Sequence, residues 1–521
     1  MNKGQRRKGL AVLILSAWVL ALAWHAKREY LRPASVRLAE ASANLVPATS
    51  FYTIKLGDAP IGYASARIDT LPDGFILEDD MRLRISALGR DVPARARTWA
   101  KLGPRLDLEE FEFSLRSDFG DYKVRAVMQG DSVLDVTVEA GGDEQRFTIE
   151  TEGPVLLPQV MPMHFALGEN PEPGKTYAFE VFDPSIMERQ RVDVEVVGRE
   201  TLIYPDSVEL DDESGWVTVT YDTVETWHVK QRFGGVEIES WLDPDGRSVR
   251  STSPLGYTIE RTAFEIAWDD YRNIAAAAPG AGPDIIELTA ISVGVDLPQG
   301  EQLGGLAVRL LNVDLKGFDL DGETQALRGD TLFIGVGVRD GMGAKSGLAS
   351  PKYNLPAIGA EWEETLASTP FIQADDPEVR RVAEQAVGGS RDPLVAARRL
   401  NDWVYENLEK EITLSLPNAR QVLGARRGDC NEHTVLYVAL ARAAGLPART
   451  AAGLVYVRGR FYYHAWPEVW LDRWVPVDPT LGQFPADASH LRFVIGGLAR
   501  QVELVRLIGS LELDVVGVVE K

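Results

Sequence analysis

The sequence predicts a multidomain chain: an N-terminal membrane segment, antiparallel β-rich domains, and a C-terminal domain that combines helices with a small sheet. Three observations support this prediction. A basic cluster precedes an uncharged apolar run at the N-terminus. From Phe51 to about Asp270, apolar and polar residues alternate between turn residues, as in antiparallel strands with one solvated face. After about residue 370 the apolar spacing becomes helical.

We expect five segments in chain order. They are a membrane segment at 1–32, a β-rich domain at 33–272, a linker at 273–284, a small β-domain at 285–350 and the last domain at 351–521. The length agrees with about three folded domains, at roughly 150 residues each.

Composition excludes some classes of function. The chain has 77 Asp and Glu against 55 Lys and Arg, a formal net charge of −22. This acidic excess argues against nucleic-acid binding and against broad adhesion to anionic lipid. The single cysteine excludes an internal disulfide, which leaves the cellular compartment open.

The N-terminus predicts insertion into a membrane through residues 9–26. Basic residues between Lys3 and Lys8 precede the uncharged run Gly9–Trp24, and Lys27-Arg28 follows it. The run is shorter than the roughly 20 residues that span a bilayer comfortably. An uncleaved signal anchor, with the bulk of the chain periplasmic or otherwise extracytoplasmic, competes with a signal peptide cleaved after Ala23. The basic pair after the run favours the anchor, and a buried core helix is the third interpretation.

The β-rich region shows no catalytic cluster. In one of its strands Met81, Leu83 and Ile85 alternate with Arg82 and Arg84. Its isolated histidines, His164 and His228, are interpreted as structural or surface residues. A curved sheet of this kind is suited to a polymer or other envelope ligand, or it serves as a spacer.

The segment after the β-rich domain predicts a linker and then short strands. Residues 273–284 are rich in Ala, Gly and Pro, which is typical of linkers. Ile286, Leu288 and Ala290 then alternate as in a strand. Glycine-containing stretches near 335–346 lack the glycines that nucleotide motifs require, and Asp319–Gly322 is too short for a calcium loop. We therefore expect no cofactor and no metal.

Helices open the last domain. Asp376-Pro377 and Asp392-Pro393 each combine an N-cap with a proline at the first helical position, which predicts helices through about Val387 and Glu409. Asn418–Leu423 is expected to form a short helical turn. Near the C-terminus, Leu491–Ile495 and Gln501–Val518 are expected to be strands.

Cys430 stands where a loop turns into a helix. Asp429 is a good N-cap, and the apolar spacing after Thr434 continues as a helix to about Gly445. The free N–H groups and the positive end of the dipole in a first helical turn favour a thiolate. A buried structural cysteine is the alternative.

A base and an orienting acid follow in the chain. Phe461–Trp470 is expected to be a strand, and Arg473–Thr480 its hairpin partner, which places His464 beside Asp478. Cys430, His464 and Asp478 then supply a nucleophile, a base and the group that orients the base.

These segments resemble the transglutaminase-like superfamily of papain-type cysteine enzymes. The resemblance rests on three stretches and covers about residues 370 to 495: Arg427–Cys430 with the helix end at Ala439–Arg449, His464–Val469, and Trp474–Thr480. It implies an α+β fold with a helix packed on a small antiparallel sheet, and a triad at Cys430, His464 and Asp478.

Other residues are candidates for each role. The backbone N–H of Cys430 is the expected oxyanion donor, with Gln421 or Trp403 as side-chain candidates. His433 is an alternative base, Glu468 and Asp472 are alternative orienting acids, and Glu432 is interpreted as a partner of the helix dipole.

The predicted function is a cysteine enzyme that hydrolyses or transfers the acyl groups of peptide amide bonds through a thioester, outside the cytoplasm. Its expected partners are a peptide or protein substrate and the membrane. No calcium site is visible to suggest calcium activation. The alternative is a non-catalytic binding or scaffold protein of the cell envelope.

Overall fold

The computed structural model describes residues 34–118, 120–130, 132–140, 143–151, 153–211, 215–233, 235–298, 303–335, 348–413 and 415–520. The predicted membrane segment at 1–32 lies outside the described residues, so both the anchor and the cleaved signal peptide stay predictions. Within the described ranges, no helix combines the length and the apolar character needed to cross a bilayer.

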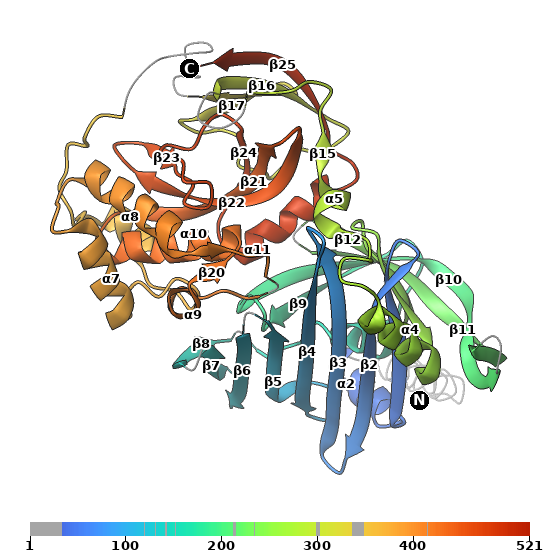
Figure 1. Cartoon of the computed structure of the whole chain (residues 1–521). Coiled ribbons are helices and arrows are strands. Elements are labelled where there is room, and N and C mark those ends of the chain that lie inside the picture. Colours follow the sequence, from blue (N-terminus) through green and yellow to red (C-terminus); the bar gives the residue numbers. More distant parts are fainter. Residues whose placement is uncertain are drawn as a thin grey trace, which may run out of the picture.

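The β-rich region forms one antiparallel sheet of 14 strands in the order β8-β7-β6-β5-β4-β3-β2-β1-β14-β13-β12-β11-β10-β9 (Figure 1). Its strands are β1 (Ala48–Leu56), β2 (Ala59–Leu71), β3 (Gly74–Ala87), β4 (Arg90–Leu102), β5 (Leu108–Ser117), β6 (Gly120–Gln129), β7 (Val133–Ala140), β8 (Asp143–Glu150), β9 (Thr176–Asp183), β10 (Glu188–Asp211), β11 (Gly215–Phe233), β12 (Val236–Leu242), β13 (Ser248–Thr252) and β14 (Tyr257–Thr262). The predicted antiparallel β-rich region is confirmed.

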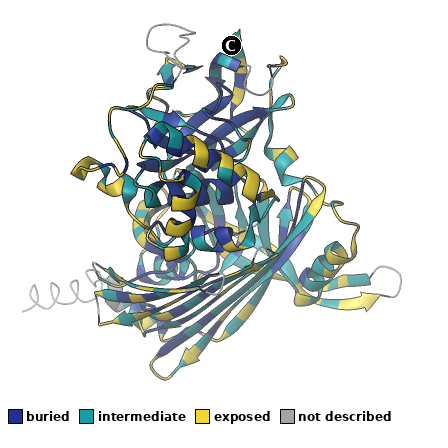
Figure 2. Cartoon of the chain, turned by 60° about the vertical axis from the view of Figure 1, so that its left-hand side comes forward, coloured by how far each residue is buried: buried dark blue, intermediate teal, exposed yellow. Residues whose placement is uncertain are grey.

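The two faces of this sheet have different neighbours. The sheet is strongly curved (Figure 2). Apolar residues of α2 (Ala34–Ser42), α3 (Met161–Met163) and the π-helical turn η1 (His164–Gly168) join the strands in one core. On the other face, α4 (Phe264–Ala276) lies across β1 and β2. This division follows from the alternation of side chains along each strand.

The predicted linker is largely structured. Residues 273–276 belong to α4, and Gly280 packs so closely on Gly89 that a Cβ there would lie 2.5 Å from the Gly89 oxygen. Asp284 caps the short helix α5 (Ile285–Thr289). The strand predicted at Ile286, Leu288 and Ala290 is therefore wrong. The N-cap of Asp284 outweighs a short alternating pattern that fits either structure.

The small β-domain predicted at 285–350 is not separate. Its strands β16 (Leu303–Leu311), β17 (Gln325–Arg328) and β18 (Thr331–Gly335) form a sheet that the C-terminal strand β25 (Glu512–Glu520) completes beside β16. Its core continues into the sheet of the last domain. The segment predicted as a strand at Gln501–Val518 begins instead with α11 (Leu498–Gln501) and the 3-10 helix η5 (Val502–Leu507).

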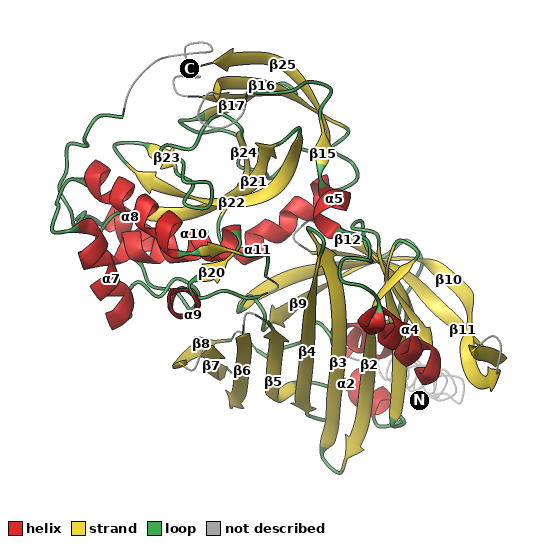
Figure 3. Ribbon diagram, viewed as in Figure 1, coloured by secondary structure: helices red, strands yellow, loops and turns green. Residues whose placement is uncertain are grey.

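The last domain packs helices on a small sheet, as Figure 3 shows. The helices are η4 (Ala360–Trp362), α6 (Glu363–Leu366), α7 (Pro377–Val387), α8 (Pro393–Asn407), α9 (Ala419–Ala425) and α10 (Cys430–Ala443). The sheet order is β15-β22-β21-β24, with β23 beside β22. These strands are β15 (Ile291–Ser292), β21 (Ala448–Val457), β22 (Arg460–Trp470), β23 (Trp474–Pro476) and β24 (His490–Ile495). The domain core surrounds α10, which is almost completely buried.

The β-rich sheet holds the segment that leads into α10. A short parallel pair, β19 (Glu409–Lys410) and β20 (Arg427–Gly428), precedes that helix. The Arg427 side chain donates to the Asp118 carbonyl oxygen at 2.7 Å and pairs with Glu411 at 2.9 Å. The turn between β5 and β6 therefore contacts the chain three residues before Cys430.

Candidate active site

Cys430 is the first residue of α10, and a capping box fixes its position. Asp429 Oδ1 accepts a hydrogen bond from the Asn431 N–H at 2.8 Å, and the Asp429 N–H donates to Glu432 Oε2 at 2.8 Å. Gly428 has φ +154°, and a Cβ there would collide with Glu432. The N–H of Cys430 lies in the first turn, where no intrahelical acceptor is available, so it is placed to donate to a ligand.

Cys430 and His464 line the same cavity of about 200 Å³, which Ala465, Gln501 and Ile508 also help to form. The cavity thus brings together the start of α10, the middle of β22 and the 3-10 segment η5. The Tyr463 hydroxyl, also on this wall, is buried and has no hydrogen-bond partner among the described residues. The sequence alone did not single out Tyr463.

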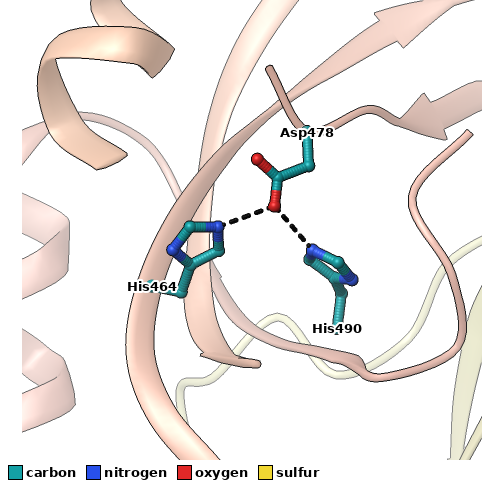
Figure 4. Close-up of side chains that lie close together, drawn as sticks. All are labelled: His464, Asp478 and His490. Atoms are coloured by element: carbon teal, nitrogen blue, oxygen red, sulfur yellow. Dashed lines mark hydrogen bonds and ion pairs between the residues drawn. The ribbon is translucent and has the colours of Figure 1, made fainter. Parts of the chain in front are cut away.

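His464 is held by Asp478 (Figure 4). The distance between His464 Nε2 and Asp478 Oδ2 is 2.8 Å. Asp478 Oδ1 accepts from the backbone N–H groups of Thr480 and Leu481 at 2.7 and 2.9 Å. Because an ionised carboxylate only accepts, Nε2 of His464 carries a proton, which leaves Nδ1 as the acceptor in the neutral ring.

Asp478 is not on the hairpin strand where the sequence placed it. Strand β23 ends at Pro476, and Asp478 lies in the following loop, paired with Gln483 by two backbone hydrogen bonds of 3.0 and 2.9 Å. Prolines at 476 and 479 flank this position. Since proline lacks a backbone donor, it ends regular pairing here. The loop nevertheless brings Asp478 to the expected histidine.

The structure adds a second histidine that the sequence did not reveal. His490, the first residue of β24, places Nε2 3.0 Å from Asp478 Oδ2 and Nδ1 3.3 Å from Asp487 Oδ1. Burial alone would lower the pKa of His490, but Asp478 and Asp487 raise it to about 9. At neutral pH, His490 is therefore an imidazolium between two carboxylates. An acid three residues before a histidine is too weak a signal to have found it.

The charge on Asp478 is stabilised from both sides. Burial would raise the pKa of this carboxyl, but His464 and His490 hold it well below its usual range. Asp478 is fully buried, and every hydrogen bond described above favours its ionised form. Asp478 is thus negatively charged at neutral pH, as the orientation of a catalytic imidazole requires.

The thiol environment differs from what the helix position predicted. Burial raises the pKa of Cys430 well above its usual value; the nearby Asp429 carboxyl raises it further, and the Ala465 backbone N–H opposes this. The dipole at a helix N-terminus favours a thiolate, but here acidic residues of the capping box surround the same turn. The resting site therefore holds a neutral thiol, and deprotonation requires a base at the moment of attack.

The alternative base and acids have other partners. His433 Nδ1 donates to the Asp429 carbonyl oxygen at 2.7 Å, and burial lowers the pKa of the ring. Glu468 pairs with Arg449 and Arg492 at 2.6 and 2.9 Å. Asp472 accepts from the Lys352 N–H in a turn. Neither acid contacts His464.

The side-chain oxyanion candidates lie away from the cavity. The Gln421 amide nitrogen is close to Gly120 of the β-rich sheet. Trp403 stacks under the Arg426 guanidinium at 4.7 Å. Neither residue lines the Cys430 cavity. The backbone N–H of Cys430 is the oxyanion donor that remains of the three candidates.

His464, Asp478 and His490 also form a set that resembles a metal site. Their ligand atoms lie within 4.8 Å of one another. The same atoms are already joined by hydrogen bonds of 2.8 and 3.0 Å that centre on Asp478 Oδ2. The hydrogen bonds between these residues thus occupy the atoms that would ligate a metal. A metal here would break the hydrogen bond to Asp478 that orients His464.

Comparison with known proteins places the site within a described family. Residues 380–479 match the model of the transglutaminase-like superfamily, a range that includes Cys430, His464 and Asp478 but not His490. An uncharacterized protein of Haemophilus influenzae is 31% identical over 97 residues, which cover 18% of this chain and 26% of the relative. The chain therefore spans only about a quarter of that relative.

Solved structures give weaker likenesses. A candidate cysteine protease from Cytophaga hutchinsonii aligns with 42% of this chain and 86% of its own length, at 15% identity and a TM-score of 0.27. A β-barrel-like protein of a domain of unknown function from Brucella abortus aligns with 42% of this chain and 96% of its own length, at 15% identity and a TM-score of 0.31. At these TM-scores we draw no conclusion from either likeness.

Proposed function

Because residues 380–479 form a transglutaminase-like domain, we propose that this chain is a cysteine enzyme that cleaves or transfers the acyl groups of peptide amides through a thioester on Cys430. One observation carries the proposal. Cys430 and His464 face one cavity, and Asp478 holds His464 through Nε2, so that Nδ1 is the basic nitrogen. This is the arrangement of a nucleophile, a base and an orienting acid.

The proposed reaction uses the Cys430 thiol, the His464 ring and the backbone N–H of Cys430, with water or an amine as the acyl acceptor. His464 Nδ1 takes the thiol proton as the Cys430 sulfur forms a bond to the amide carbon. The carbonyl oxygen becomes an oxyanion, which the N–H of Cys430 stabilises. The same proton passes to the leaving nitrogen as the C–N bond breaks, which leaves a thioester. Water or an amine then attacks the thioester carbon and gives a proton to His464 Nδ1, and this proton passes to the sulfur as the C–S bond breaks, which restores the thiol.

The first test follows acylation of the thiol. We expect p-nitrophenyl acetate to give a burst of nitrophenol and an acetyl mass on Cys430, the only cysteine of the chain. His464→Ala should slow the burst by about 10²-fold to 10⁴-fold, the range that a positioned base contributes. His228→Ala is the control, because His228 lies on β11 of the β-rich sheet and is not on the cavity wall, and its burst should match that of the parent.

The contrary result is equally clear. A thiol that reacts slowly, and at the same rate in His464→Ala, would identify the chain as a non-catalytic binding or scaffold protein.

Once acylation is shown, the fate of the thioester is read by adding an amine. A new amide product indicates transfer, and unchanged release of acid indicates hydrolysis.

The extracytoplasmic location belongs to the same proposal. Its support is the order of basic residues, apolar run and basic pair over residues 3–28. Protease added to spheroplasts, in which the outer envelope is opened and the inner membrane is intact, should degrade the part of the chain after residue 40. Protection of that part until the cells are lysed would contradict the location.

A further inference from the structure

A second cavity, of about 480 Å³, lies inside the β-rich domain. It shares no lining residue with the Cys430 cavity. Its wall is mainly apolar, with Leu77 and Phe113 on one side and Ile238 and Ile259 on another. Its volume falls in the range of about 300 to 1,000 Å³ that is typical of small-molecule sites.

The strand register explains why this space exists. Ala66, Asp79 and Thr98 are partners on the adjacent strands β2, β3 and β4, so their side chains share one face. In the next row, Met81 lies between alanines on both neighbouring strands. Because small side chains surround Asp79, the curved sheet keeps a cavity where larger residues would fill the core.

Asp79 differs from the other charged residues of the wall. Those others are paired: Arg67 with Asp69, Asp80 with Arg95, and Arg247 with Asp243. Asp79 Oδ1 is buried and accepts no hydrogen bond from any residue that the structure describes. Burial raises the pKa of this carboxyl to about 7, and no neighbouring cation opposes the effect. A buried carboxylate oxygen that accepts no hydrogen bond is costly, so a ligand that donates to it gains affinity.

A second acceptor lies at the same place. Gln159 Oε1 is also buried with no donor among the described residues, while Nε2 of the same amide is 3.5 Å from the Thr98 hydroxyl. Thr98 stands directly beside Asp79 on the next strand. The site therefore offers two unfilled acceptors. An ammonium group supplies three donors and no acceptor, which is the complementary set.

We propose that this cavity binds a small amphipathic amine, whose ammonium group donates to Asp79 and Gln159 and whose hydrocarbon body lies against the apolar wall. The binding site is separate from the proposed active site, and the proposal does not depend on catalysis. A protonated amine is the headgroup that offsets a lone carboxylate, whereas an acid would repel it and an alcohol would leave its charge unpaired.

Three probes with the same eight-carbon chain test the headgroup. The full chain is titrated by calorimetry with octylammonium, octanol and octanoate at pH 8. Octylammonium should bind at least ten-fold more tightly than octanol, and octanoate should not bind measurably. Equal affinity for octylammonium and octanol, or no binding of octylammonium, would overturn the proposal.

Variants then locate the bound amine. Asp79→Asn, which keeps the shape of the side chain, should lower octylammonium affinity at least ten-fold and leave octanol affinity unchanged. Glu78→Gln removes the same charge one residue away, on the opposite face of β3, and should bind like the parent. Ala66→Leu should weaken both ligands because it fills the cavity. Parent-like binding of octylammonium by Asp79→Asn or by Ala66→Leu would contradict this location.

Discussion

Asp478 and Asp79 are both carboxyl groups inside the protein, but their surroundings have opposite effects. Asp478 receives hydrogen bonds from two histidines and two backbone N–H groups, and its pKa lies well below the usual range. Asp79 lies in an apolar wall, and its pKa rises to about 7. The first carboxyl is an ion at every relevant pH, whereas the second is half protonated near neutrality.

The number of hydrogen bonds to a buried carboxylate distinguishes a group that orients a catalytic residue from a group that binds a ligand. A buried charge with every lone pair filled is fixed in place, and it can orient a neighbouring group such as His464. A buried charge with an empty lone pair weakens the free protein and is relieved when a ligand arrives. The desolvation penalty of Asp478 is offset by hydrogen bonds within the protein. The desolvation penalty of Asp79 is offset only when a ligand donates a hydrogen bond to it.

The largest effect should come from Asp478→Asn. The amide cannot hold the proton on Nε2 of His464 in the same way, and it leaves the His490 imidazolium without its main partner. We expect the acylation rate of Cys430 to fall by about 10³-fold or more. The measurement is the nitrophenol burst at pH 7.5, with folding checked by circular dichroism.

Asp487→Asn is the matched control for that variant. Asp487 contacts His490 but not His464. The burst rate of Asp487→Asn should stay within about ten-fold of the parent. If both variants lose activity equally, Asp478 acts through general stability and not through the orientation of His464.

The next effect concerns His490 and stability at alkaline pH. Its folded pKa of about 9 lies above its ordinary value of about 6.5, so its stabilisation is complete below pH 6.5 and is lost as the pH rises through 9. The loss should be on the order of 3 kcal/mol in the free energy of unfolding. Urea unfolding from pH 6 to 10 measures it.

His490→Gln removes the titrating group and should flatten that pH profile. If His490 only supported the fold, the variant would keep the pH dependence of the acylation rate seen in the parent. If it holds Asp478 toward His464, that pH profile should shift as well. A variant that still loses about 3 kcal/mol between pH 6.5 and 9 would show that another group titrates.

A second effect on stability, of the opposite sign, should come from Asp79→Asn. The folded pKa of Asp79, about 7, lies above the usual value of about 3.9, so ionisation destabilises the folded chain as the pH rises from 4 to 7. The variant should therefore be more stable than the parent by about 4 kcal/mol at pH 8, and equally stable below pH 4. Equal stability at pH 8 would show that Asp79 is already solvated or paired.

Local signals in the sequence located much of the last domain. The Asp-Pro pairs at 376 and 392 predicted helices that begin where α7 and α8 begin, with both aspartates as N-caps. Asp429 caps α10 as predicted. Such signals succeed because a cap and its helix are neighbours in the chain, and the hydrogen bonds involved span only two or three residues.

Contacts between segments that are distant in the chain produced the structural features that were not predicted from the sequence. The strand β25 completes a sheet more than 170 residues earlier in the chain, and a short alternating segment at Ile285–Thr289 became a helix. The spacing of apolar residues along the chain does not predict such pairings. Whether a face of a segment is buried depends on which distant segment packs against it.

The sequence alone determined the order of the parts: a β-rich region, a capped helix that begins at the single cysteine, and His464 followed by Asp478. Tertiary structure alone decided the chemical environment of these residues. It brought His490 to Asp478, raised the pKa of Cys430 by burial, and placed Asp79 in an apolar wall where its Oδ1 has no hydrogen-bond partner among the described residues. The physical reason is that charge and burial depend on all neighbours in space, whereas a sequence lists only neighbours along the chain.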